Sequence, residues 1–310
     1  MKRYTAATAL LLLLILAGCS WGETTGAFNP PSGSSNPQQI GRKLSGICLG
    51  PYLTGNPNTG SQVSESDLRA YLDYVAANFT GCRMYGATSG LEKFPAIAKE
   101  LGLKVAAGCW LSSDLNANEN EVNSLIVSCQ AGNVDVAVVG SEVLLRRDLT
   151  EDQLLGYITR VKATGAKVTT SDTWHTLVEH PRIIAACDEV WANIYPFWEG
   201  VSIDQAVARL QSDYDQIKAV AGDKEVIIAE TGWPSSGDAH QAAMPSLQNE
   251  AEYFTNFVNW ANAQNVGFYY FEMFDEPWKT EPGLVGAHWG IWDSGMQLKP
   301  GCADGFGSIS

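Results

Sequence analysis

The amino-acid sequence predicts an α/β fold, a (β/α)₈ TIM barrel in a single domain. Apolar runs of strand length alternate with amphipathic stretches of helix length from residue 45 onwards, with no second linker. Such alternation gives a parallel sheet with right-handed crossovers, and eight strands over about 260 residues match a barrel. A doubly wound sheet is the alternative. The segment after the first strand, Leu49-Gly50-Pro51-Tyr52, lacks the Gly-x-Gly-x-x-Gly pattern of that fold.

The predicted strands are short apolar runs that end at turn residues. In chain order they cover residues 45–49, 81–85, 103–109, 135–140, 167–171, 189–195, 225–230 and 266–272. The seventh is the clearest, because four apolar residues lead directly into Glu230 and a Gly-Trp-Pro turn then ends the run.

The predicted helices carry apolar residues at the 3.6-residue period. Ser64 provides a start signal for the first helix, whose apolar face is formed by Leu68, Tyr71, Leu72, Val75 and Phe79. Another helix begins after Thr150 and continues through Val161. The remaining helices are expected over 91–101, 119–130, 176–186, 203–220 and 247–264.

The first 18 residues predict a secretory signal peptide. A basic start is followed by an apolar run that is too short for a stable membrane span. The ending Leu16-Ala17-Gly18-Cys19 resembles a bacterial lipobox, which implies that Cys19 is the lipidated first residue of the mature protein. An ordinary signal peptide cleaved nearby without lipid is the alternative. We therefore expect an exported protein, lipid-anchored to the cell envelope, at the outer membrane if the source is Gram-negative.

Gly, Ser, Pro, Asn and Thr dominate residues 19–42, which predict a lipidated cysteine followed by a flexible tether, with the folded domain over 43–310. Hydrophobic residues make up 45% of the chain and charged residues 17%, enough for a sizeable core. Without residues 1–18 the chain has 18 basic and 34 acidic residues, a net charge of −16. Such a chain is repelled by phosphate backbones, so nucleic-acid binding is not expected.

Histidines and cysteines give no sign of a metal site. None of the four histidines shows ligand spacing, and no Cys-x-x-Cys pair is present. We expect no metal and no cofactor, and a monomeric protein. An exported location permits disulfides, but their connectivity cannot be read from the positions Cys48, Cys82, Cys109, Cys129, Cys187 and Cys302.

Two glutamates stand at the carboxyl ends of predicted strands, Glu142 after the fourth and Glu230 at the end of the seventh. Catalytic groups of α/β barrels lie at these ends. Either glutamate alone could be a salt-bridged rim residue. Together they favour a paired-carboxylate enzyme, because glycoside hydrolysis needs one protonated and one ionised carboxyl group.

The other strand ends carry aromatic, amide and charged side chains. Aromatic faces stack on sugar rings, and carboxylates and amides bond to hydroxyl groups, so the sequence favours a carbohydrate site. No nucleophilic Ser-His pair appears among the residues at these ends, which are Tyr52, Arg83, Tyr85, Trp110, Asp172, Trp174, Asn193, Tyr195, Trp233, Glu272, Asp275, Glu276 and Lys279.

Seven segments in order resemble glycoside hydrolase family 17, the β-1,3-glucanases and glucan transglycosylases. Glu230-Thr-Gly-Trp-Pro-Ser235 is the most specific segment. The others begin at Gly46, Cys82, Val138, Val190, Phe271 and His288, the last including Trp289, and they span residues 45–300.

The resemblance implies a retaining mechanism with Glu142 as acid/base and Glu230 as nucleophile. It also implies that Tyr85, Tyr195, Glu276 and Lys279 lie near the subsite where the bond breaks, and it makes Tyr52, Asn193, Trp233 and Trp289 substrate-binding candidates. Two departures stand out. Ser141 replaces the asparagine that commonly bonds the sugar 2-hydroxyl, and Gly286 and Ala287 stand where the family often has a glutamate, whose supporting role is absent or taken by Glu281.

The leading hypothesis is a retaining β-1,3-glucan hydrolase, endo-acting, on the cell surface. The nearest alternative is a transglycosylase, which shares the glycosyl-enzyme but passes the sugar to another glucan. A catalytically silent glucan-binding lipoprotein would be expected to lose one of the two glutamates, and neither is lost. A structural role in the cell envelope without sugar is the remaining class.

Overall fold

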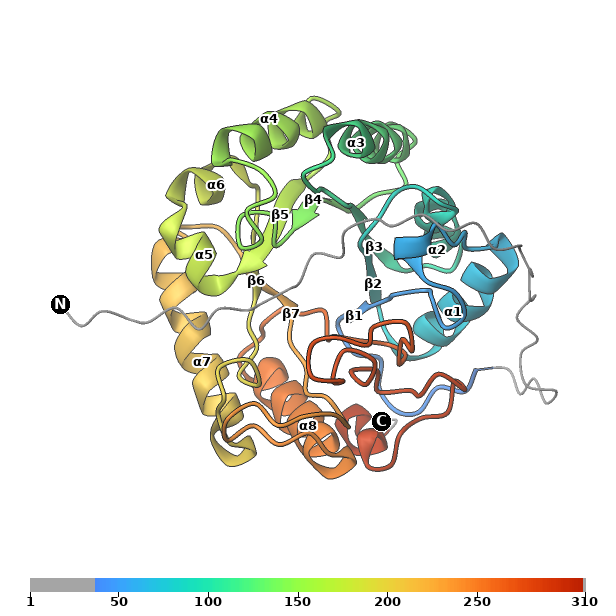
Figure 1. The fold of residues 1–310 in the computed structure, drawn as a ribbon, viewed down its shortest axis with the longest axis vertical. Helices are drawn as coiled ribbons and strands as arrows, with labels where there is room; N and C mark the ends of the chain where they lie inside the picture. The colour runs from blue at the N-terminus through green and yellow to red at the C-terminus, as the bar shows by residue number, and fades with distance from the viewer. Residues whose placement is uncertain (1–36, 309–310) are drawn as a thin grey trace.

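A parallel barrel surrounded by helices forms the part of the chain that the computed structural model describes, residues 37–308 (Figure 1). Seven strands form one sheet in sequence order, and every neighbouring pair is parallel. The strands are β1 (Ile47–Cys48), β2 (Gly81–Met84), β3 (Lys104–Cys109), β4 (Val136–Ser141), β5 (Val168–Thr173), β6 (Val190–Asn193) and β7 (Val226–Glu230).

The eighth predicted strand closes the barrel through short, irregular pairing. Tyr270 bridges to Ile47 of β1, and Phe268 bridges to Ile228 of β7, both in parallel orientation. Backbone hydrogen bonds join the same segment to both neighbours, from Cys48 N to Tyr270 O (2.9 Å) and from Tyr269 N to Ile228 O (2.9 Å). The predicted (β/α)₈ barrel is therefore confirmed, with an eighth position that pairs at single residues only.

The helices occupy the outside of the barrel, as the sequence period predicts (Figure 1). Ser64 caps the first helix through Asp67 N, and Thr150 forms a capping box with Gln153. The helices are α1 (Glu65–Asn78), α2 (Phe94–Glu100), α3 (Leu115–Gln130), α4 (Glu151–Lys162), α5 (Trp174–Glu179), α6 (Pro181–Ala186), α7 (Ile203–Val220) and α8 (Leu247–Ala263), with 3-10 turns η1 (Pro57–Thr59), η2 (Leu91–Lys93) and η3 (Cys302–Phe306).

Two helix predictions need correction. Residues 176–186, expected as one helix, form α5 and α6, because Pro181 lacks a backbone N–H and disfavours helical geometry at His180. The helix expected from residue 119 begins at Leu115, since the Asp114 carboxylate accepts hydrogen bonds from Asn116 N and Ala117 N.

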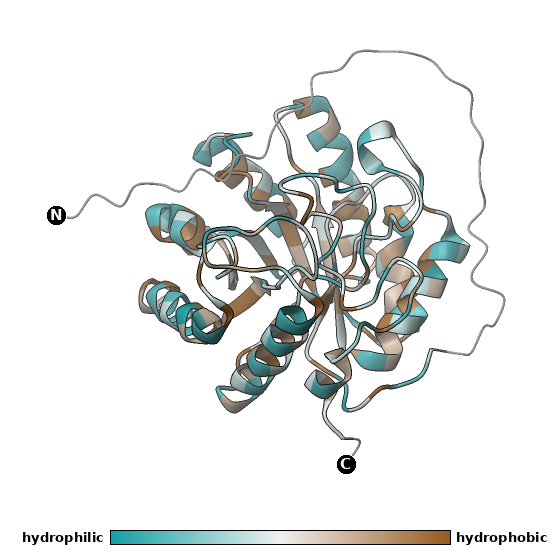
Figure 2. Cartoon of the chain, turned by 60° about the horizontal axis from the view of Figure 1, so that its bottom comes forward, coloured by the Kyte–Doolittle hydropathy of each residue, from teal (hydrophilic) through white to brown (hydrophobic). Residues whose placement is uncertain are grey.

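Apolar side chains fill both the inside of the barrel and the layer between strands and helices. Inside, Trp191 and Tyr269 pack at ring centroids 5.0 Å apart among small strand residues such as Ala106 and Val138. Figure 2 shows the hydrophobic strands at the centre and hydrophilic residues on the outer parts of the helices. The filled interior means that the barrel is a rigid support for groups at its rim.

Part of the tether predicted over residues 19–42 packs against the barrel. Ile40 packs against the core and its N–H donates to Asn78 Oδ1 at 2.9 Å, while Arg42 N donates to Phe306 O at 3.1 Å. Residues 40–42 are therefore part of the barrel base. The predicted signal peptide and Cys19 lie outside the described residues.

All six cysteines within residues 37–308 are free, and no helix there is long and apolar enough to cross a membrane. In the same part of the chain no three His, Cys, Asp or Glu side chains are grouped so as to hold a metal ion.

Candidate active site

Both strand-end glutamates follow irregularities in strand pairing. Between β4 and β5 the register shifts between Val138 and Ser141, just before Glu142. Between β6 and β7, Ala192 pairs with Ile228 but Asn193 pairs with Glu230, so β7 has one extra residue. Because a one-residue slip turns a side chain to the other face, these bulges determine how each glutamate is presented.

Glu230 is buried and held by three polar partners. Its Oε1 lies 2.9 Å from Arg83 Nη1 and accepts a 3.2 Å hydrogen bond from Ser141 Oγ. Its Oε2 accepts a 2.9 Å hydrogen bond from the Tyr195 hydroxyl. A cation and two donors stabilise an ionised carboxylate.

Arg83 rises from β2 into the barrel interior, and its side chain is only 1% exposed. It also donates to Ala229 O (2.7 Å) and Ser171 Oγ (2.6 Å). The guanidinium thereby holds both the Glu230 carboxylate and the backbone carbonyl of the residue before it. Arg83 was predicted to lie at a strand end, but its pairing with Glu230 was not predicted. A single arginine inside an otherwise apolar strand is the sequence feature that could have indicated a buried ion pair.

Glu142 adopts a left-handed backbone conformation with φ of 54°, and its N–H donates to Ser171 O at 2.8 Å. Asn193 Nδ2 donates to Glu142 Oε1 at 2.9 Å. Burial raises the pKa of Glu142 to about 7, and the negative charges of Glu230 and Asp172 add to this effect, against the Asn193 bond and the Arg146 charge. Glu142 is therefore protonated in weakly acidic solution.

Residues 193–195, at the end of β6, donate hydrogen bonds to both carboxyl groups: Asn193 to Glu142 and Tyr195 to Glu230. The Oδ1 atom of Asn193 is buried without a hydrogen-bond partner among the described residues. It is available to a ligand hydroxyl beside the two glutamates. Tyr85 lies next to this pair, with its ring 4.7 Å from the Arg83 guanidinium.

Lys279 is the centre of a second cluster of charged side chains, which lies just after the eighth predicted strand. Its Nζ lies 3.0 Å from each oxygen of Glu272 and also pairs with Glu276. Trp278 Nε1 donates to Glu276 Oε1 at 2.9 Å and its ring contacts Tyr52 edge-on at 6.4 Å. Glu281 stays a prediction for the supporting role of the missing family carboxylate; the carboxylates that pair with Lys279 are Glu272 and Glu276.

Burial and charge shift the pKa values of the two carboxyl partners of Lys279 in opposite directions. Burial raises the pKa of Glu272 well above its usual value, and the neighbouring Glu276 adds to this against Lys279. The pKa of Glu276 is lowered, because Lys279 and the bonds it receives outweigh its burial. Gly50 lets this carboxylate approach, since a Cβ there would lie 2.2 Å from Glu276 Oε2.

Three of the predicted substrate-binding residues are engaged by other groups of the protein. Trp233 is fully buried, donates from Nε1 to Met244 O (3.0 Å) and packs on Phe197, so it supports the site from behind rather than stacking on a sugar. Trp289 is 3% exposed and packs edge-on against Tyr195 at 5.4 Å. The Ser141 hydroxyl bonds Glu230 and Arg83 instead of standing free for a sugar hydroxyl.

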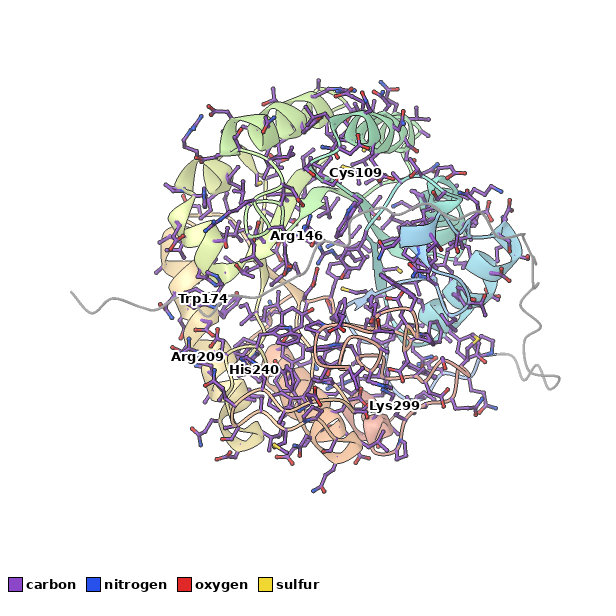
Figure 3. The ribbon with its side chains drawn as sticks, in the orientation of Figure 1. Cys109, Arg146, Trp174, Arg209, His240 and Lys299 are labelled. Atoms are coloured by element: carbon purple, nitrogen blue, oxygen red, sulfur yellow. The ribbon has the colours of Figure 1, made fainter. Side chains whose placement is uncertain are left out.

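An exposed aromatic side chain lies close to Glu142. Trp110, after β3, is 43% exposed, and the Arg146 guanidinium lies 4.5 Å from its ring. Arg146 lies inside the ring of helices in Figure 3 and donates to Ser141 O at 2.6 Å, which ties the tryptophan to the Glu142 turn. Further round the rim, Trp174 and Arg209 lie side by side in Figure 3 and both bond Glu199.

The site therefore presents one carboxylate paired with a buried arginine and one carboxyl group whose pKa is raised to about 7. Such a pair can supply a nucleophile or base and a proton donor in the same reaction.

Comparison with known proteins gives a family match over residues 46–290, to the BtgE/BtgC glycoside hydrolase domain. Glucan 1,3-beta-glucosidase of Saccharomyces cerevisiae is 28% identical over 270 residues, covering 78% of this chain and 86% of that protein. The glucan 1,3-beta-glucosidase of Arthroderma benhamiae is 30% identical over 267 residues, covering 77% of this chain and 85% of that protein.

Solved structures agree with the fold. The glycoside hydrolase family 17 beta-1,3-glucanosyltransferase of Rhizomucor miehei superposes with a TM-score of 0.74 at 31% identity, covering 83% of this chain and 96% of that one. An endo-laminarinase from Formosa has a TM-score of 0.68 at 19% identity, covering 83% of this chain and 84% of that one, a likeness of fold alone.

Proposed function

This chain belongs to glycoside hydrolase family 17, as a BtgE/BtgC-type catalytic domain. We propose that it hydrolyses internal bonds of β-1,3-glucan through a covalent glycosyl-enzyme. Relatives from yeast and Arthroderma are named glucan 1,3-beta-glucosidases, which supports the substrate class. The protein needs no cofactor for this chemistry, and we propose that it acts as a monomer.

In the proposed first step Glu230 attacks the anomeric carbon while Glu142 gives its proton to the departing glycosidic oxygen. The bond from carbon to the leaving sugar breaks as the bond to the Glu230 oxygen forms. In the second step Glu142, now ionised, takes a proton from water, and this water displaces Glu230 with retention of stereochemistry overall.

The contrast between the surroundings of Glu230 and those of Glu142 carries this proposal. Arg83 and Tyr195 stabilise negative charge on Glu230, whereas burial and two nearby carboxylates keep the proton on Glu142 to about pH 7. A catalytically silent glucan-binding protein would have no use for this asymmetry. Asn193, Tyr85 and Trp110 are the groups that we propose contact sugar in addition.

A glucan transglycosylase is the second candidate, favoured by the 31% identity with the Rhizomucor miehei glucanosyltransferase. It would share both carboxyl roles and differ in the acceptor, a second glucan in place of water. Product analysis of one purified β-1,3-glucan oligosaccharide separates the two. Only shorter products support hydrolysis, products longer than the substrate support transfer, and an unchanged substrate contradicts both.

We also propose that the protein is exported and held at the cell envelope by a lipid on Cys19, at the outer membrane in a Gram-negative source. The Leu-Ala-Gly-Cys ending supports this. Mass spectrometry of the N-terminal peptide of the native protein tests it. An unmodified Cys19, or a mature terminus elsewhere, would contradict the anchor without affecting the catalytic proposal.

A further inference from the structure

Asp172 lies in β5 and is 2% exposed, close to the turn that carries Glu142. Its Oδ2 accepts hydrogen bonds from Leu144 N (3.1 Å) and Leu145 N (3.4 Å), and its Oδ1 accepts one from Thr173 N at 2.8 Å. A buried carboxylate of β5 thus holds the backbone two and three residues after Glu142, in the turn that follows the neighbouring strand β4.

The turn after β4 needs such a support. Glu142 is in the left-handed region, which is unfavourable for a residue other than glycine and persists only when the surrounding structure fixes it. Arg146 fixes the turn from the other side, through its N–H to Glu142 O (3.0 Å) and its Nη1 to Ser141 O (2.6 Å). Asp172 and Arg146 therefore hold opposite parts of one strained segment.

Several elements present charge or polarity to the Glu142 carboxyl group. Glu230 faces it from β7, Asn193 and Tyr195 from β6 and the residues after it, and Arg146 from its own turn. Asp172 faces it from β5 and is the second negative group. Burial raises the pKa of Asp172 to about 6, so it is largely ionised where Glu142 titrates, at about 7.

We propose that Asp172 is a positioning residue for the acid/base, which holds the Glu142 turn through its backbone bonds and keeps a second negative charge beside the Glu142 carboxyl group. This role rests on the proposed function, because it assumes that Glu142 acts as the proton donor. In this role Asp172 acts through Glu142 and not on the substrate.

The test compares Asp172→Asn with the unchanged protein on two substrates over a range of pH. A β-1,3-glucan oligosaccharide needs protonation of its leaving group, whereas a dinitrophenyl β-glucoside does not. Removal of the negative charge favours ionised Glu142, so the alkaline limb of kcat/KM for the oligosaccharide should move to lower pH. Above the limb, each unit of movement lowers the rate about tenfold, and the activated glycoside should be affected much less.

Two further variants separate charge from shape. Asp172→Glu keeps the charge and should leave the limb in place even if the rate falls. Asp188→Asn is the matched control, because Asp188 accepts a 2.8 Å bond from Val168 N at the opposite end of β5; it should leave the limb unchanged. Asp172→Ser takes the place of Asp172→Asn if that variant does not fold.

The possible results are distinct. Equal losses on both substrates with no movement of the limb would show a purely structural role and overturn this proposal alone. A limb that moves equally in Asp172→Glu would also overturn it. If the protein without any substitution does not cleave the oligosaccharide, that result would contradict the proposed function and this role together.

Discussion

Arg83 and Glu230 form an ion pair inside the barrel, with 2.9 Å between Nη1 and Oε1 and side-chain exposures of 1% and 8%. A buried charge without its partner is strongly unfavourable, so each residue depends on the other. The same guanidinium donates to the backbone carbonyl of Ala229, so its position determines the position of the Glu230 carboxylate.

Arg83→Lys tests this dependence. Lysine keeps the charge but cannot form the planar fork that reaches Ala229 O, Ser171 Oγ and Glu230 together. We expect a loss of about 1–3 kcal/mol in the free energy of unfolding and a large fall in kcat. Thermal unfolding and oligosaccharide cleavage measure the two effects. The exposed Arg182→Lys is the control, and full activity in Arg83→Lys would refute the role given to the fork.

Glu230→Ala should abolish cleavage of β-1,3-glucan, because it removes the atom that attacks the anomeric carbon. Azide can enter the space and should restore turnover with inverted stereochemistry, as followed by NMR of the glycosyl azide. Glu225→Ala, a change at an exposed residue just before the same strand, should retain activity. Azide products of retained configuration would mean that the roles of Glu230 and Glu142 are exchanged.

Glu142→Ala should lower the rate on glucan by about 10²–10⁴-fold, the usual contribution of a general acid. A dinitrophenyl glycoside needs no protonation and should still form the glycosyl-enzyme. Added azide should then give a product of retained stereochemistry. Equal losses on both substrates would argue against an acid/base role.

The pH dependence follows from the direction of the Glu142 shift. Burial, with help from Glu230 and Asp172, raises its pKa from 4.5 to about 7, and the active form of the free enzyme is protonated. Activity on glucan is therefore present below this value and lost as the pH rises through it. We expect an alkaline limb in kcat/KM near pH 7; a limb near the ordinary glutamate value would exclude Glu142 as the group observed.

Glu272 and Glu276 should respond differently to the same change. The pKa of Glu272 is raised by burial, whereas that of Glu276 is lowered because Lys279 outweighs its burial. Glu272→Gln replaces the carboxyl group whose ionised form burial disfavours, and should therefore change KM less. Glu276→Gln removes a charge from Lys279 and should weaken substrate binding, seen as a higher KM. Equal effects of the two variants would contradict this difference between the two glutamates.

Much of the fold follows from local sequence, since strand runs and helix periods are short-range signals. Seven strand candidates correspond to β1–β7, and the capping roles of Ser64 and Thr150 hold. The eighth strand is weaker than its apolar run suggests, because single bridges on both sides replace a continuous ladder. The break at Pro181 could have been predicted from its missing N–H.

The site was less accessible from sequence. Position at a strand end located Glu142 and Glu230, but not the bulges that turn them, which depend on pairing between strands. Trp233 shows the limit clearly: its place beside the nucleophile motif suggested a sugar contact, yet its ring is in the core. The partners of Arg83 and Asp172 come from positions far apart in the chain, so no local pattern could reveal them.

The bond between Arg42 and Phe306 brings the two ends of the domain together at one pole of the barrel. This pole is the amino end of the strands, because Ile40 and Leu44 lie against Asn78 and Phe79, just before β2. Glu142 and Glu230 occupy the other pole. The entry of the chain at Ile40 and its return at Phe306 therefore both lie on the side of the barrel away from the two glutamates.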